Sequence, residues 1–286
     1  MRIALFSDIH GKILLPFLLC DQYQKATGKA IDLILQCGDL GAYPDLNNLD
    51  KATLKHAQYD RAELGFHDDF TTEKPQIKAF LTALNLDMIC VRGNHEDHAY
   101  LNALEKKYPT ESLFPIDIYR RVWLCKSGEA QRFERNGFVI NFVGIGRIGD
   151  RKGRTDERFI QNYERQKIKA LYKTKTHFDF LITHDGDDAS QRGYGMAELQ
   201  ELLDKVIFHY HFYGHTGEAF KLELAPNGIT QSCKIKELEF DLAGKLPPGC
   251  MLILEKKADE QFKLEIVPQS FTNPFTQQNW KYHLEN

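Results

Sequence analysis

Three histidines fall within seven positions in the segment His209–Glu218, which reads HYHFYGHTGE. Imidazoles in such a cluster are typical ligands of divalent metal ions. Neighbours in sequence need not bind one ion, because side chains on extended backbone alternate between two faces. His209 and His211 belong to a predicted strand or its approach, and we expect both to face packing or to point away from a metal site. His215, which lies beyond the strand end and after Gly214, is the candidate ligand.

Metal-capable side chains also follow four other predicted strands, each at the point where the strand ends. The five strands are predicted at Ile3–Ser7, Leu33–Cys37, Met88–Val91, Phe180–Thr183 and His211–Tyr213. The side chains that follow them are those of Asp8, His10, Asp39, Asn94, His95, His184 and His215. Each alone fits a turn or a helix cap, but the carboxyl ends of strands in an α/β sheet gather at one edge, where ligands bind. The set as a whole therefore predicts a metal centre at that edge.

The periodicity of the chain predicts one α/β domain over residues 1–286. Short apolar runs alternate with amphipathic helical stretches in the first two-thirds, and residues 229–268 are predicted as a C-terminal block of strands that completes the core. Residues 42–86 separate two consecutive strands by far more than an ordinary loop. Their patterning predicts a helical insertion over one edge, which serves either as a cap on the core or as a wall of the substrate mouth.

The composition indicates the compartment and the binding partners that we expect for the protein. A formal net charge of −3 gives no global field for nucleic acid, so any such contact needs a local basic patch. No apolar run reaches the roughly 18 residues of a membrane span, and the apolar start of the chain is too short for a signal sequence. The six cysteines are dispersed, which favours buried free thiols in a reducing compartment. We therefore expect a cytoplasmic protein with no membrane partner.

The motifs at the strand ends follow a recognisable order. They are DxH at Asp8–His10, GDxG at Gly38–Gly41, GNHE at Gly93–Glu96, a lone His184 and GH at Gly214–His215. This series resembles the calcineurin-like metallophosphoesterase superfamily over residues 3 to about 216. The resemblance implies an α/β fold, the calcineurin-like four-layer α-β-β-α sandwich with two mixed sheets, and two divalent metal ions at the strand ends.

The resemblance also implies a role for each side chain. Asp39 would bridge the two metals, and the other ligands would be divided between a first site, Asp8 and His10, and a second site, Asn94, His184 and His215. His95 would act with Asp39 in catalysis, by stabilising the transition state or protonating the leaving oxygen, and Glu96 would orient a ligand or His95. Two cations generate hydroxide near neutral pH and neutralise phosphoryl charge. Mixed oxygen and imidazole ligands suit Mn, Fe, Zn or Ni.

The last motif departs from the family pattern. The superfamily usually ends in GHxH, whereas residues 214–217 read GHTG, so Gly217 stands where a second histidine would serve the first metal. Three arrangements are open: the first metal is held with water in the gap, Glu218 or His211 takes the place, or the site is weak and fills only with substrate. We expect the first arrangement, because catalytic metals keep an open position. A Gly217→His variant should then bind the first metal more tightly.

The predicted function is a metal-dependent phosphoester hydrolase that uses a two-metal-activated hydroxide, a phosphodiesterase acting on nucleotides or on RNA or DNA. The diester preference rests on a partial likeness, through CGD, GNHE, VGIGRIG and THDG, to RNA lariat debranching enzymes. Those enzymes typically carry cysteine at the first aspartate and keep the final histidine, the reverse of this chain, which argues against debranching itself. The alternatives are a phosphomonoesterase and a catalytically weak metal-bound interaction scaffold, and the presence of His95 favours an enzyme.

Two arginines are the candidate substrate-binding residues. Arg147 follows the strand predicted at Phe138–Gly144, and Arg192 lies in the loop HDGDDASQRGYG. Arg92 and Tyr194 are weaker candidates. A guanidinium can hold a phosphate through paired hydrogen bonds, and an aromatic ring can stack a base. Alternatively, each of these four side chains is an ordinary surface residue without a role in substrate binding.

Overall fold

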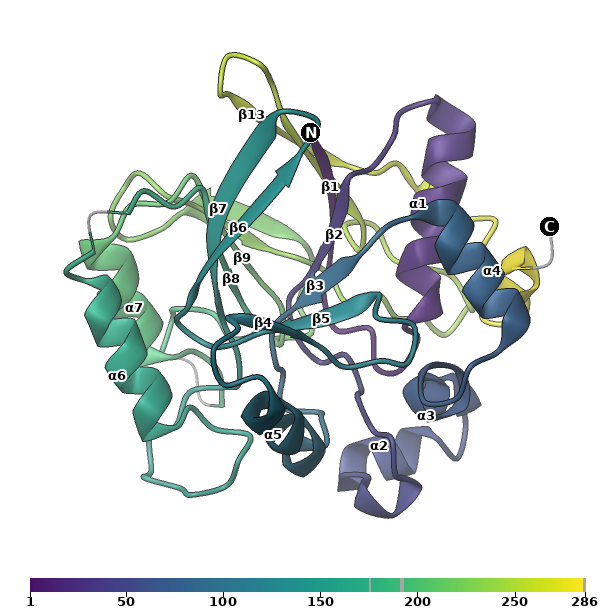
Figure 1. The fold of residues 1–286 in the computed structure, drawn as a ribbon, viewed down its shortest axis with the longest axis horizontal. Helices are drawn as coiled ribbons and strands as arrows, with labels where there is room; N and C mark the ends of the chain where they lie inside the picture. Colours follow the sequence, from purple (N-terminus) through teal and green to yellow (C-terminus); the bar gives the residue numbers. More distant parts are fainter. Residues whose placement is uncertain (175, 191–192, 285–286) are drawn as a thin grey trace.

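Two β-sheets form the centre of the molecule, and helices cover the outer face of each (Figure 1). The computed structural model describes residues 1–174, 176–190 and 193–284. Fully buried apolar side chains from both sheets, such as Leu5, Leu35, Phe180 and Phe212, pack together in one core. Two further cores join each sheet to its own helices. The predicted fold class, an α/β sandwich of two mixed sheets between helical layers, is confirmed.

The larger sheet has seven strands in the order β13-β12-β1-β2-β3-β5-β4. Their bounds are β1 Arg2–Phe6, β2 Leu33–Gln36, β3 Met88–Cys90, β4 Leu113–Pro115, β5 Val122–Cys125, β12 Leu252–Lys256 and β13 Phe262–Ile266. Strands β1, β2, β3 and β5 run parallel, whereas β12 pairs antiparallel with β1. The residues that follow β1, β2 and β3 therefore meet at one edge of this sheet.

The smaller sheet has six strands in the order β10-β11-β9-β8-β7-β6. Their bounds are β6 Ala130–Arg135, β7 Phe138–Ile145, β8 Phe180–Thr183, β9 Tyr210–Tyr213, β10 Lys221–Leu224 and β11 Gln231–Lys234. Strands β7, β8, β9 and β11 run parallel, and β6 and β10 are antiparallel edge strands. The ends of β8 and β9 consequently lie side by side.

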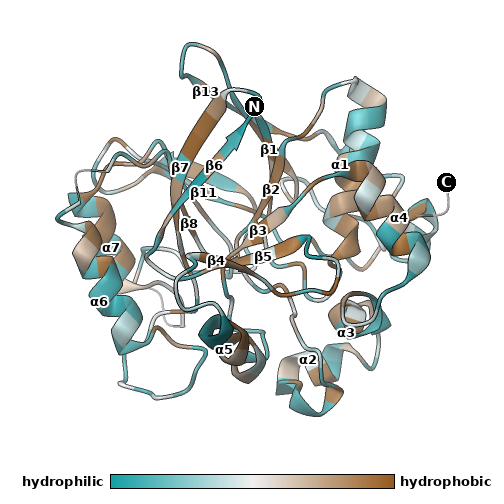
Figure 2. Cartoon of the chain, in the orientation of Figure 1, coloured by the Kyte–Doolittle hydropathy of each residue, from teal (hydrophilic) through white to brown (hydrophobic). Residues whose placement is uncertain are grey.

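Helices α1, Leu14–Thr27, and α4, Pro75–Leu84, lie on the side of the larger sheet, and α6, Asn162–Leu171, and α7, Ala197–Lys205, lie on the side of the smaller one (Figure 1). Helix α5, His98–Lys107, follows the GNHE motif, and α8, Gln269–Thr272, and the 3-10 helix η3, Trp280–Leu284, end the described chain. Figure 2 shows hydrophobic residues concentrated along central strands such as β1, β2 and β7, with hydrophilic residues mixed into the outer helices. Within the described ranges, no helix combines the length and the apolar character that a membrane crossing requires.

The segment 42–86 is a series of short helices. It contains the 3-10 helix η1, Leu46–Asn48, then α2, Lys51–His56, the 3-10 helix η2, Arg61–Leu64, α3, Gly65–Phe70, and α4. Asp50 and Asp60 each accept hydrogen bonds from backbone N–H groups of the next turn, so each begins a short helix within the predicted helical insertion. Helix α2 contributes Ala52, Thr53 and His56 to the wall of the cavity described below.

The C-terminal strands divide between the two sheets. Strand β11 joins the smaller sheet, and β12 and β13 join the larger one. Of the predicted strand SCKIKELEF, residues 232–240, only Ser232, Cys233 and Lys234 belong to β11. Beyond it the chain crosses between the sheets, where the Leu238 backbone N–H donates to the Ser7 carbonyl at 3.1 Å. Strands β4, β5, β6 and β10 are not among the predicted strands. The edge strands β6 and β10 have one buried residue and none, respectively, so their periodicity is weak, and β4 and β5 have only three and four residues.

The pairing of β12 with β1 predicts that the C-terminal strands stabilise the core. Leu254 on β12 lies opposite Ile3 and has no exposed surface. Leu254→Ala should lower the free energy of unfolding by about 2–5 kcal/mol, because it leaves a cavity. The matched control is Leu242→Ala at a fully exposed position, where a change of at most about 0.5 kcal/mol is expected. Equal urea-unfolding midpoints for the two variants would contradict this packing.

Candidate metal centre

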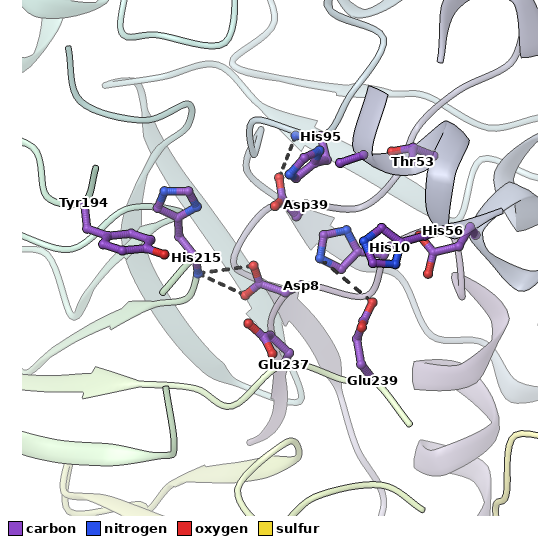
Figure 3. Close-up of a pocket in the computed structure, with 12 residues that line it drawn as sticks. Asp8, His10, Asp39, Thr53, His56, His95, Tyr194, His215, Glu237 and Glu239 are labelled. Carbon is purple, nitrogen blue, oxygen red and sulfur yellow. Dashed lines mark hydrogen bonds and ion pairs between the residues drawn. The ribbon is translucent and has the colours of Figure 1, made fainter. Parts of the chain in front are cut away.

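Side chains from both sheets converge where the parallel strands end. Asp8 follows β1, Asp39 follows β2 and Asn94 follows β3, whereas His184 and His215 follow β8 and β9 of the smaller sheet. The point of convergence opens into a cavity of about 290 Å³ (Figure 3). Its described lining residues are Asp8, His10, Asp39, Ala52, Thr53, His56, Glu63, His95, Tyr194, His215, Glu237 and Glu239.

Asp39 lies at the middle of this arrangement and is 2% exposed. Its Oδ1 atom accepts hydrogen bonds from the backbone N–H groups of Asn94 at 2.7 Å and His95 at 2.8 Å, and it lies 3.3 Å from Nε2 of His184. Burial opposes ionisation of the carboxyl group, but the imidazoles of His184, His95 and His10 hold the pKa of Asp39 well below its usual range. The carboxylate is therefore ionised and available to a cation.

The backbone is strained at four of the predicted ligands. The φ angles are 46° at Asp8, 38° at His10, 53° at Asp39 and 68° at His215. Such conformations cost L-residues about 1–3 kcal/mol each and cluster at functional sites. A Cβ atom on Gly93 would lie 2.0 Å from Oδ1 of Asp39, so only glycine allows this approach. The strain is concentrated at the residues predicted to do chemistry.

The donor atoms form two groups that share one carboxylate. Within each group the atoms lie within 4.8 Å of one another, and the groups are Asp8, His10 and Asp39, and Asp39, His184 and His215. Oδ1 of Asn94 lies 3.0 Å from Nε2 of His184, which places it with the second group. The structure thus brings the six predicted ligands together in the division expected from the resemblance. Their binding of metal stays a prediction.

His215 has a buried nitrogen that needs a partner. Its Nε2 atom makes no hydrogen bond within the described part of the chain, and an unpaired buried polar atom costs about 1–3 kcal/mol. Burial first, and then the charge of His184, lower the pKa of His215 to about 4. The imidazole is therefore neutral near pH 7, which is the form that binds a metal ion. A divalent cation fits this set of donors.

His184 is held so that one nitrogen faces the centre. Its Nδ1 atom lies 2.9 Å from the carbonyl oxygen of Cys37, which can only accept, so Nδ1 carries a hydrogen and Nε2 points toward Asn94 and Asp39. Burial alone would lower the pKa of His184, but the charge and hydrogen bond of Asp39 raise it to about 10. An incoming cation would displace a proton from this nitrogen.

His95 is positioned by a carboxylate that the sequence motifs do not include. Its Nδ1 atom lies 2.6 Å from Oδ2 of Asp50, which also accepts a hydrogen bond from the Tyr43 hydroxyl at 2.5 Å. Burial lowers the pKa of His95, but the hydrogen bond to Asp50 and the charge of Asp39 outweigh it and raise the pKa to about 9. Asp50 lies in the helical segment 42–86, where only its role as an N-cap is visible in the sequence.

Glu96 ties together the two loops that carry the central ligands. Its carboxylate accepts hydrogen bonds from the backbone N–H groups of Leu40 at 2.9 Å, Ala42 at 2.8 Å and Gly93 at 3.3 Å. Leu40 and Ala42 belong to the loop after Asp39, and Gly93 begins the GNHE motif. Glu96 thus orients the loops of the ligands, and the observed hydrogen bond that orients His95 comes from Asp50.

The arginines proposed as substrate contacts do not line the cavity in the described residues. The Arg147 side chain is 1% exposed, and its Nε atom lies 3.0 Å from the Glu164 carboxylate, so its contacts favour a structural role. Arg92 is likewise buried, in an ion pair with Glu105. Arg192 lies outside the described residues. Tyr194 does line the cavity, with its ring centroid 5.1 Å from that of His215.

One of the residues considered as a replacement for the missing histidine is unable to serve. His211 is fully buried, and its two ring nitrogens lie 2.8 Å from the Thr183 hydroxyl and 2.9 Å from the Ser232 hydroxyl. Glu218 is exposed and is absent from the described lining of the cavity. Glu63 and Glu239 line the cavity beside His10, with donor atoms within 4.8 Å of one another, and Glu237 lines it as well (Figure 3). No motif indicates these three carboxylates.

The buried position of His211 predicts an effect on stability at acidic pH. Burial lowers the pKa of His211 to about 3, so below pH 6.5 the unfolded chain binds a proton that the folded chain does not, and stability falls as the pH decreases. The free energy of unfolding of the wild type should fall more steeply between pH 6 and 4 than that of His211→Gln, by about 1.4 kcal/mol per pH unit. His177→Gln, at an exposed histidine, is the control. Parallel curves for the wild type and His211→Gln would contradict this assignment.

Comparison with known proteins identifies the fold and the family. No curated protein sequence matches the chain. The crystal structure of TT1561 from Thermus thermophilus aligns with 93% of this chain and 99% of its own, at 15% identity and a TM-score of 0.52, which shows a common fold. A Candida albicans 5'-nucleotidase aligns with 99% of this chain but 54% of its own length, at 12% identity and a TM-score of 0.44. The calcineurin-like phosphoesterase family matches residues 1–219, and the chain belongs to that family.

Proposed function

We propose that this metallophosphoesterase is a phosphodiesterase that acts on nucleotide or nucleic-acid substrates. The observation that carries the proposal is a second cavity, of about 360 Å³, that adjoins the candidate metal centre through Asn94 and Tyr194. Its wall carries four basic residues and an aromatic ring, from Arg151, Lys152, Arg154, Arg158 and Phe159. In a chain with a net charge of −3, this is the local basic patch that nucleic-acid contact requires.

The chemistry of the second cavity suits the part of a diester that lies beyond the scissile phosphate. A monoester presents one phosphate, which the metal centre alone could hold. Guanidinium and ammonium groups bind further phosphates, and Tyr194, between the two cavities, offers a ring on which a base can stack. Arg158 pairs with Asp156, and both side chains are about half exposed. Exposed pairs of this kind are weak, so a phosphate can compete for Arg158. Arg154 pairs with Asp150, whose side chain is buried.

The residues of the chain have distinct roles in the proposed reaction. Two divalent cations, when bound by the ligands around Asp39, would supply charge neutralisation and an acidified water. His95 carries a proton that it can donate to the leaving oxygen or share with the phosphoryl group. Asp50 fixes the orientation of that imidazole, and Tyr43 fixes Asp50. This three-membered chain of hydrogen bonds supports an enzyme over a scaffold, because a scaffold needs no oriented acid.

The identity of the ions and the compartment are also proposals. The predicted ligands are carboxylates, an amide and imidazoles, which suit Mn, Fe, Zn or Ni, and we propose Mn²⁺ as the ion to supply first. All six cysteines are free and buried, which supports a reducing compartment such as the cytoplasm. Phosphomonoesterase activity and a catalytically weak scaffold are the alternatives that the assays below distinguish.

The role of His95 predicts a loss of turnover with little change in substrate binding. With Mn²⁺ and bis-p-nitrophenyl phosphate as substrate, His95→Ala should lower kcat by about 10²–10⁴-fold. Asp50→Asn should lower kcat by about 10–100-fold with KM little changed. Asparagine keeps the N-cap of α2, so this variant removes the charge and leaves the helix intact.

The same assay separates the alternatives. Faster turnover of p-nitrophenyl phosphate than of the diester would favour a monoesterase. Hydrolysis of neither substrate with any of the four metals would favour the scaffold. Turnover unaffected by both His95→Ala and Asp39→Asn would show that the site lies elsewhere.

Substitution of the basic residues in the second cavity should lower the turnover of an oligonucleotide more than that of a small diester. Lys152→Ala and Arg158→Ala should each lower kcat/KM for a single-stranded oligonucleotide by about tenfold, the effect of losing one charge-assisted hydrogen bond. Turnover of bis-p-nitrophenyl phosphate, which has one phosphate, should stay within about twofold of the wild type. Lys263→Ala, on the edge strand β13, is the matched control. Equal losses on both substrates would contradict a role for this cavity in binding the extended substrate.

A further inference from the structure

Gly217, which stands at the position of the missing histidine, is exposed and has a left-handed backbone conformation. Its φ angle is 70°, a conformation that strains any L-residue. A Cβ atom on Gly217 would lie 3.2 Å from Oε1 of Glu237. A carboxylate from a distant part of the chain thus borders the space in which a histidine side chain would begin. The Gly217→His variant would carry backbone strain, and its effect on the first site stays a prediction.

The segment after β11 delivers two carboxylates to the first group of donors. Leu238 is fully buried, and its backbone N–H donates to the Ser7 carbonyl, next to Asp8. Glu237 and Glu239, on either side of Leu238, both line the cavity that contains Asp8 and His10 (Figure 3). This follows the alternation of extended backbone, in which residues two apart share a face. We call Glu237 and Glu239 the acidic pair.

Glu239 lies within ligand range of the ion that His10 would bind. Its Oε1 atom is 4.0 Å from Nε2 of His10. Two donor atoms that are each about 2.1 Å from one ion can lie at most about 4.2 Å apart, so the observed separation allows both to bind one cation. Figure 3 shows the Glu239 carboxylate directed toward His10.

The charges around the acidic pair are not balanced by the lysines that contact it. Lys12 lies 2.9 Å from Glu63 and 3.5 Å from Glu239, so it is shared between two carboxylates. Lys236 lies 3.2 Å from Glu237 and also donates to the Gly217 carbonyl at 2.6 Å. Lys234 adds a third positive charge near Asp8 and Glu237. Three lysines thus stand against five carboxylates, those of Glu63, Glu237, Glu239, Asp8 and Asp39. Like charges in a partly buried site favour the uptake of a cation.

We propose that the acidic pair replaces the missing histidine at the first metal site, with Glu239 as the direct ligand that shares the ion with His10; the donor atoms of these two residues and of Glu63 all lie within 4.8 Å of one another. Glu237 borders the position of the lost side chain and adds a second carboxylate. The inference rests on the proposed two-metal centre and deepens it. The first site becomes rich in carboxylate oxygen, whereas the second keeps two imidazoles, so the first site should prefer Mn²⁺ over Zn²⁺ relative to the second.

Titration of the metal-free protein with Mn²⁺, followed by calorimetry and by electron paramagnetic resonance, tests the proposal without any measurement of turnover. The wild type should bind two ions per chain. Glu239→Gln should weaken one of the two sites by about 10- to 100-fold, and Glu237→Gln/Glu239→Gln should reduce the stoichiometry to one. Glu218→Gln, at the exposed glutamate next to Gly217, is the matched control and should bind two ions like the wild type. Thermal unfolding of each metal-free variant confirms that it is folded.

The outcomes separate this proposal from the proposed function. Two tight sites in both glutamine variants, or a single ion in the wild type, would overturn the role of the acidic pair. Two ions in the wild type and one in the double variant would support it, even if the protein hydrolyses no phosphodiester. Turnover of a phosphodiester with unchanged binding in the variants would leave the proposed function standing and overturn only this inference.

Discussion

The Asp39 carboxylate is the group on which the rest of the centre depends. A buried carboxylate is stable only where hydrogen bonds and opposite charges replace its hydration. Here the backbone N–H groups of Asn94 and His95 come from the larger sheet, and the imidazole of His184 comes from the smaller one. Groups from both sheets therefore contact one carboxylate. The distance between the sheets determines the distances between the metal-ligating atoms around it.

The two donor groups around Asp39 differ in origin and in character. The second group takes its imidazoles from the ends of β8 and β9, and the buried Nε2 atom of His215, which has no hydrogen-bond partner among the described residues, is available to a ligand. The first group lies toward the segment after β11, whose glutamates we propose as replacements for an imidazole. Such a centre would hold two ions of different chemical preference.

The helical segment 42–86 links the periphery of the fold to the centre. It begins immediately after the GDxG motif and carries both Tyr43 and Asp50, so the orientation of His95 depends on the start of α2. The same helix lines the cavity with Thr53 and His56. Of the two roles considered for this segment, its position suits a wall of the substrate mouth, and its contacts add the positioning of a proton donor.

Much of the centre could be predicted from the sequence, because it is encoded locally. Asp8, Asp39 and Asn94 each follow a short apolar run at once, and two of them follow a glycine that permits a close approach. Asp50, Glu237 and Glu239 could not be predicted, because each reaches the site through tertiary packing from a segment without a motif. Arg147 was misleading for the opposite reason: its place after a strand suggested a site, whereas the fold buries it against Glu164.

The most direct measurement is a crystal structure of the protein loaded with Mn²⁺, with anomalous diffraction used to locate the ions. Two anomalous peaks about 3.5–4 Å apart, one on each side of the Asp39 carboxylate, are expected, the first near His10 and Glu239 and the second near His184 and His215. Anomalous peaks only at other positions, or none within ligand distance of Asp39, would contradict the two-metal centre.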